Sequence, residues 1–142
     1  SLEEVKEKVL ATDISAGDPV RLLDELLETL LRHVFEKRRT LSAMVRMIVE
    51  DAEMRTMPCD FKNHPAREIR EKMVELFRRG AAEGVFPPMD PVLMDAVLHS
   101  TLHGVIHEFI AHEEQVRDVD EVIAAVKNLI LYGFCGKEPK NP

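Results

Sequence analysis

The segment Leu76–Pro91, LFRRGAAEGVFPPMDP, constrains the fold more than any other part of the chain. Gly80 narrows the last turn of a helix, and Gly84 can take the left-handed conformation that ends it. The apolar Val85-Phe86 pair can then fold back onto the core. Two prolines prevent helix continuation, and the closing Asp-Pro pair supplies an N-cap and a first-turn proline for a new helix. This pattern predicts two helices joined by a sharp corner.

Apolar residues recur at helical spacing along the rest of the chain, and no segment alternates as a strand would. The sequence predicts an all-α bundle of five to six helices in a single domain, residues 1–142. The expected helices are Leu2–Ala11, Asp18–Glu36, a helix with an apolar stripe from Leu41 to Ala52, one from about Pro65 to the corner, Asp90–His112, and one from Asp118 or Asp120 to Gly133 or Gly136.

Composition narrows the function classes. Hydrophobic residues make up 45% of the 142 residues and the net charge is −7, which is unfavourable for binding a phosphate backbone. No apolar run is long enough for a membrane span, and the acidic N-terminus does not resemble a secretory signal. Cys59 and Cys135 lie far apart and form no CxxC motif, which favours a reduced, cytoplasmic protein.

Catalytic motifs are absent from the sequence. There is no glycine-rich phosphate loop, no HExxH and no GxSxG, and neither Ser42 nor Ser100 has the context of a nucleophile. The many charged residues of the helix before the corner predict a solvent-exposed face. Ion pairs between residues four apart, such as Glu68–Lys72, are expected on it. We therefore expect no enzymatic activity and no cofactor.

The histidines form the one cluster of side chains that could bind a metal ion or a ligand. His99, His103 and His107 recur every four residues along one edge of the predicted Asp90–His112 helix, with Asp95 one turn earlier. Imidazoles one turn apart can share a Zn²⁺ or Ni²⁺ ion. Three successive turns, however, spread too far for a single ion, and the histidines flank an apolar stripe. The pattern favours hydrogen-bonded or pocket-lining histidines over a metal site.

Seven methionines are more than a chain of this size usually carries. Met is flexible and polarisable, and it suits surfaces that accept varied apolar shapes. Ordinary core packing explains any single one of them, but the group favours an adaptable apolar cavity.

The last two predicted helices carry more apolar surface than packing within one small domain requires. Such helices commonly meet their symmetry mates in a four-helix bundle, so the pattern favours a homodimer, although both helices could instead be central in the monomer. The expected dimer interface contains Leu98, Leu102, Val105, Phe109, Val122, Val126, Leu129 and Ile130.

The chain resembles the ligand-binding domain of TetR-type (tetracycline-repressor-like) transcriptional regulators. Leu2–Ala11 is similar to the connecting helix that follows their DNA-reading head, and Asp18–Glu36 is similar to the next family helix. Gly80, Gly84, Phe86 and Asp90-Pro91 match the family's corner before the dimerising helices, and Gly104 lies where a small residue is common. No basic helix-turn-helix segment precedes Leu2, so the resemblance implies operator binding only through a head outside this chain.

The resemblance implies a bacterial homodimeric regulator in which a small, mostly apolar effector controls the spacing of the DNA-binding heads. The effector-contacting residues that we expect are Leu27, Met44, Met47, Met73, Phe77, His99 and His103. Two alternatives remain open: a stand-alone metal or ligand carrier built on the histidine edge, and a helical protein-interaction adaptor that is monomeric when alone.

Overall fold

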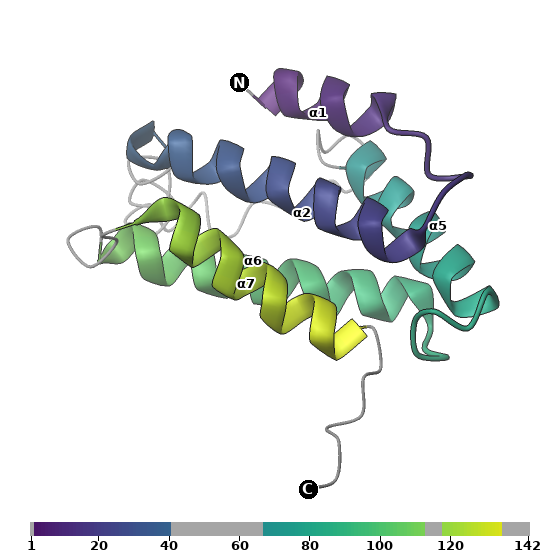
Figure 1. Ribbon diagram of the computed structural model, residues 1–142. Coiled ribbons are helices and arrows are strands. Elements are labelled where there is room, and N and C mark those ends of the chain that lie inside the picture. The colour runs from purple at the N-terminus through teal and green to yellow at the C-terminus, as the bar shows by residue number, and fades with distance from the viewer. Residues whose placement is uncertain (1, 41–66, 113–117, 135–142) are drawn as a thin grey trace, which may run out of the picture.

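The computed structural model describes residues 2–40, 67–112 and 118–134 (Figure 1). These residues form helices and no strand, which confirms the predicted all-α fold. The helices are α1 (Leu2–Ala11), α2 (Pro19–Glu36), α5 (Arg67–Ala82), α6 (Pro91–Ala111) and α7 (Val119–Phe134). The predicted stripe from Leu41 to Ala52, with Met44 and Met47, lies outside the described residues.

Aspartates begin three of the helices. The Asp18 carboxylate accepts a hydrogen bond from the Val20 amide at 3.0 Å, and Asp90 accepts one from the Val92 amide at 2.9 Å. Each satisfies an amide that a helix N-terminus leaves without an intrahelical acceptor. Asp118 likewise accepts from the Asp120 amide at 2.9 Å. The sequence signals for these helix starts are thereby confirmed.

The corner between α5 and α6 forms as the sequence predicts. Gly84 adopts a left-handed φ of 73°. The amides of Val85 and Phe86 both donate to the Gly80 carbonyl, at 2.9 and 3.0 Å, and so satisfy an acceptor in the last turn of α5. The Phe86 ring lies directly over Gly80, where a side chain would overlap it, and meets the Phe77 ring edge-on at 6.0 Å. Gly80 therefore makes room for an aromatic cap on the core.

Helix α2 lies at the centre of the arrangement. It packs against α1, α5 and α7; α5 also packs against α1 and α6 (Figure 1). The apolar side of each helix faces one shared core. Its residues include Val5, Val9, Leu23, Leu26, Leu27, Leu31, Phe35, Met73, Leu76, Phe77, Phe86, Met94, Leu98 and Ile123. The Phe35 ring meets the Phe109 ring edge-on at 6.2 Å, which brings the end of α6 to the end of α2.

Candidate functional site

The residues predicted to contact an effector divide between the core and the surface. Leu27 of α2 and Met73 and Phe77 of α5 are almost fully buried and belong to the same hydrophobic core. His99 on α6 is half-buried and His103 is exposed. The described structure thus joins the three apolar members in the core between packed helices and sets the two histidines at its margin on α6.

The two histidines contact one another. Their ring centres lie 4.3 Å apart with the planes tilted by 42°. His107, one turn further along, is exposed. In the part of the chain that the structure describes, no group of three or more His, Cys, Asp or Glu side chains lies close enough to hold a metal ion.

Asp95, one turn before His99, has a role that sequence reasoning missed. Its carboxylate is buried and pairs with the Arg70 guanidinium of α5, with 2.9 Å between Oδ2 and Nε. The pair joins α5 to α6 one helical turn before His99. A carboxylate at a core-facing helical position was the available signal, because a buried charge requires a partner.

The charged side of α5 is not merely the solvated face that the sequence predicts. Lys72 donates to the Leu10 carbonyl at the end of α1 at 2.7 Å, and burial lowers the pKa of its ammonium. Glu68 pairs with Lys6 of α1 at 3.3 Å. The predicted Glu68–Lys72 pair is therefore wrong: both side chains reach across to α1 instead of to each other.

Arg79 extends the same junction beyond α1. Its guanidinium donates to the Ile14 carbonyl at 2.7 Å and to the Gly17 carbonyl, both in the segment between α1 and α2, and pairs with Glu83. Its charge-assisted bonds fix backbone that has no helical partner of its own. Helix α5 thus holds α1, the following segment and α6 through separate polar contacts.

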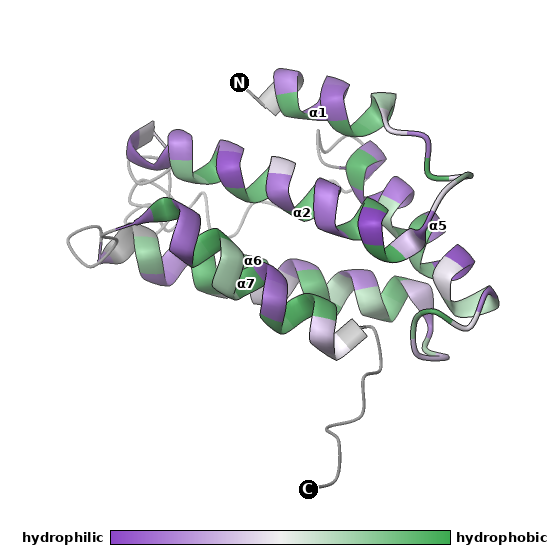
Figure 2. Cartoon of the chain, in the orientation of Figure 1, coloured by the Kyte–Doolittle hydropathy of each residue, from purple (hydrophilic) through white to green (hydrophobic). Residues whose placement is uncertain are grey.

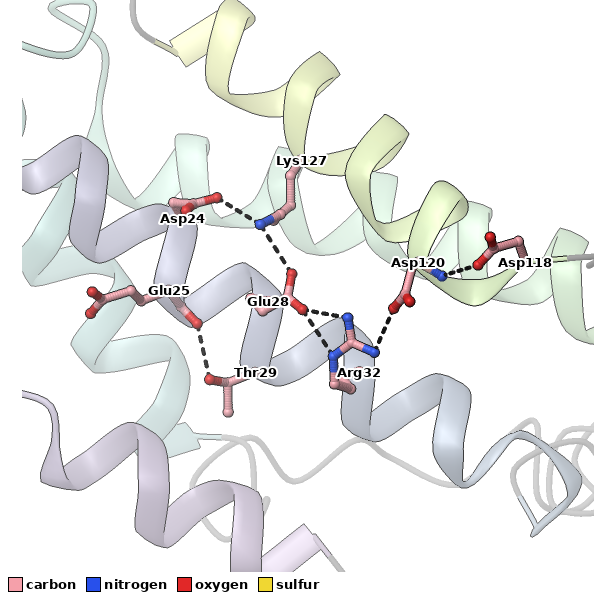
Figure 3. A network of polar contacts seen from close by, with 8 residues as sticks. All are labelled: Asp24, Glu25, Glu28, Thr29, Arg32, Asp118, Asp120 and Lys127. Atoms are coloured by element: carbon pink, nitrogen blue, oxygen red, sulfur yellow. Dashed lines mark hydrogen bonds and ion pairs between the residues drawn. The ribbon is translucent and has the colours of Figure 1, made fainter.

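A second polar network joins α2 to α7 (Figure 3). Lys127 of α7 bridges Asp24 and Glu28 of α2, each at 3.0 Å. Arg32 pairs with Glu28 at 2.6 Å and with Asp120 of α7 at 2.8 Å. Hydrogen bonds from Arg32, and then from Lys127, lower the pKa of the Glu28 carboxyl. The network lies at the rim of the core: the side chains of its other members are at least a third exposed, whereas that of Lys127 is 20% exposed.

The residues predicted for a dimer interface occupy different depths. Leu98, Leu102, Val126 and Ile130 are buried within the single chain, while Val105, Phe109 and Val122 are half-buried against its core. Only Leu129 is well exposed, at 72%. Four of the predicted interface residues therefore already have apolar partners in their own chain.

Other apolar side chains form the outer surface of these helices, and Figure 2 shows hydrophobic residues recurring along both. Leu93 and Val97 of α6 are each 53% exposed, and Tyr132 of α7 is 61% exposed. At helical spacing, Leu93, Val97, Ser100 and Gly104 share one exposed face of α6, and Ala125, Leu129 and Tyr132 share one of α7. We call these residues the outer α6–α7 face. None of them is charged, and the exposed Glu108 and Glu121 lie one turn beyond it on α6 and α7.

None of the described helices combines the length and the apolar composition that a bilayer span requires.

Comparison with known proteins finds no matching family model, no significantly similar curated protein and no significantly similar solved structure.

Proposed function

We propose that the chain is the effector-binding and dimerisation domain of a TetR-type transcriptional regulator. A small, mostly apolar ligand would control operator binding by a helix-turn-helix head outside this chain. The observation that carries the proposal is the outer α6–α7 face. Monomeric proteins rarely leave large apolar surfaces uncovered, and two long helices that each expose an apolar face suit a symmetric four-helix bundle.

The attachment of α1 supports the regulatory part of the proposal. If α1 corresponds to the connecting helix of TetR-type regulators, it would join this domain to the DNA-binding head. Val5 and Val9 bury its inner side, and Lys72 and Glu68 of α5 attach it to the helix that also contributes Met73 and Phe77 to the core. A ligand that changes how α5 packs would therefore change the position of α1.

The mechanism is allosteric rather than catalytic. An effector with higher affinity for one spacing of the two chains shifts the population of dimers that can bind the operator. Leu27, Met73 and Phe77 would provide its apolar contacts, while His99 and His103 would supply polar groups at the margin.

Native mass spectrometry of the untagged chain tests the dimer. We expect a species of about twice the 16.2 kDa chain mass. Leu129→Glu should convert it to a folded monomer, because the charge would be buried without a partner in the bundle. Val92→Glu is the matched control: Val92 is 60% exposed on α6 but lies about a quarter-turn from Leu93, so the dimer should persist.

A wild-type monomer would contradict the proposal and favour a helical adaptor that uses the same face for a different protein. Loss of the dimer in both glutamate variants would show that added charge, rather than the outer face, governs assembly. Circular dichroism must show unchanged helicity in each variant.

The effector requires a separate measurement. A panel of apolar small molecules can be screened for a rise in the unfolding temperature, since a ligand that binds only the native state stabilises it. For a compound that binds, His103→Ala should weaken binding while leaving the dimer intact, because His103 is exposed and does not belong to the outer α6–α7 face. Unchanged affinity would remove His103 from the effector site.

A further inference from the structure

We propose that His99 and His103 together bind a divalent late-transition-metal ion, such as Zn²⁺ or Cu²⁺. The two residues lie one turn apart on α6, and their ring centres are 4.3 Å apart. An ion about 2 Å from one nitrogen of each ring brings two ring centres to within roughly 5 Å of each other. The side chains are therefore already close to the separation that a shared ion requires.

The pairing is specific to these two rings. His107 stands four residues beyond His103, as His103 does beyond His99, yet within the described part of α6 the ring contact joins only His99 and His103. His99 is half-buried, which restricts its rotamers, while His103 is exposed and leaves the pair open to an ion from solvent. One anchored and one accessible imidazole form a bidentate chelate on a rigid helix.

The surroundings define the class of ion. Asp95 is one turn before His99, but its carboxylate is committed to Arg70 at 2.9 Å, so it is not a free third ligand. Two imidazole nitrogens with water completing the shell suit Cu²⁺, Ni²⁺ or Zn²⁺, whereas Mg²⁺ and Ca²⁺ prefer oxygen ligands. With two protein donors, the ion should exchange with solvent rather than remain permanently bound.

Zinc titration of the untagged chain by isothermal calorimetry tests the site. Loss of a mere outer-shell partner typically weakens metal binding roughly 10- to 100-fold, so removing a ligand by His99→Ala or His103→Ala should weaken it at least about tenfold. His107→Ala is the matched control and should leave affinity within about twofold. Equal binding by wild type and His103→Ala, or equal loss in His107→Ala, would overturn the proposal.

Nitrogen-15 spectra of the histidine side chains give a second reading that needs no substitution. On addition of Zn²⁺ to wild-type protein, the ring nitrogens of His99 and His103 should shift together and before those of His107. Binding should weaken as the pH is lowered, because protons compete for the same nitrogens. Shifts that appear first at His107, or at none of the three, would exclude the pair.

This site does not depend on the proposed regulatory function. Failure to bind Zn²⁺ would leave the dimer and the effector site untouched, whereas a monomer in native mass spectrometry would leave the histidine chelate intact.

Discussion

Helices α5 and α7 both use charged side chains to hold neighbouring helices, but at very different depths. On α5, Arg70 reaches a buried carboxylate whose side chain is only 7% exposed. On α7, Asp120 meets Arg32 with 75% of its side chain exposed. The other pairs between helices lie between these two extremes, with the Lys127 side chain 20% exposed and the Lys6 side chain 23% exposed. The contrast is therefore between the buried Arg70–Asp95 pair and the more exposed pairs.

Depth changes what each contact contributes. Exposed ion pairs contribute about 0–1 kcal/mol, because water and salt screen them. Removing one partner of a buried pair costs about 3–5 kcal/mol, because the other charge is left without compensation. The Arg70–Asp95 pair should therefore contribute more to the stability of the fold than any single pair of the α2–α7 network.

The largest effect should come from breaking the Arg70–Asp95 pair. Arg70→Met preserves the length of the side chain but leaves the Asp95 carboxylate buried and uncompensated. Because the Arg70 side chain is 26% exposed, we expect a loss of about 2–3 kcal/mol, below the range for a fully buried pair. Urea denaturation at neutral pH measures it.

Arg78→Met on the same helix is the control for lost charge and helix propensity. Arg78 is 56% exposed, and among the described residues it pairs only with Glu75 on its own helix, so its loss should cost no more than about 0.5 kcal/mol. Adding Asp95→Leu to Arg70→Met should recover part of the stability. Equal effects of the two arginine substitutions would refute the role of depth.

A smaller effect should follow from filling the space above Gly80. A methyl group there overlaps the buried Phe86 ring, and overpacking costs about 1–3 kcal/mol. Alanine also favours a helix by about 1 kcal/mol over glycine. We therefore expect Gly80→Ala to lower stability by about 1 kcal/mol in thermal or urea unfolding.

Gly133 of α7 provides the matched comparison, because nothing lies within 4 Å of a side chain added there. Gly133→Ala should raise stability by up to about 1 kcal/mol through helix propensity alone. If Gly80→Ala were equally stabilising, the Phe86 ring would have room to move, and the corner would be looser than its geometry implies.

Local signals explain why so much of the fold could be predicted. The Asp-Pro pairs at 18–19 and 90–91 and the glycine at 84 act through their nearest neighbours, and the structure places helix ends at each. The Arg70–Asp95 pair spans 25 residues and the Lys72–Leu10 bond spans 62. In the sequence, Arg70 and Lys72 cannot be told apart from basic residues that pair with an acidic residue one turn away on the same helix.

The surfaces of α6 were harder to predict for a related reason. Helix α6 carries apolar residues on all of its sides, so their spacing alone does not show which side faces the core. Met94 and Leu98 face inward, whereas Leu93 and Val97, each one position earlier, face solvent. The histidine edge was likewise predicted from spacing, but only three-dimensional packing distinguishes the His99–His103 contact from the equally spaced His107.

The smallest effect should come from the α2–α7 network. The folded-state pKa of Glu28 is lowered, mainly by hydrogen bonds from Arg32 and then Lys127. Its contribution is therefore present above the ordinary glutamate range and is lost as the pH falls through the lowered value. Glu28→Gln should cost less than about 1 kcal/mol at neutral pH, less at high salt, and nearly nothing in acid.

Glu25→Gln separates the network from simple charge removal. Glu25 is on the same helix, but in the part of the chain that the structure describes it pairs only with Arg21, one turn away. The dependence of urea midpoints on pH and salt should flatten more for Glu28→Gln than for Glu25→Gln. A loss at Glu28 as large as that at Arg70 would mean that the rim network excludes water as well as the α5 junction does. Depth would then not be what separates the two sides of this fold.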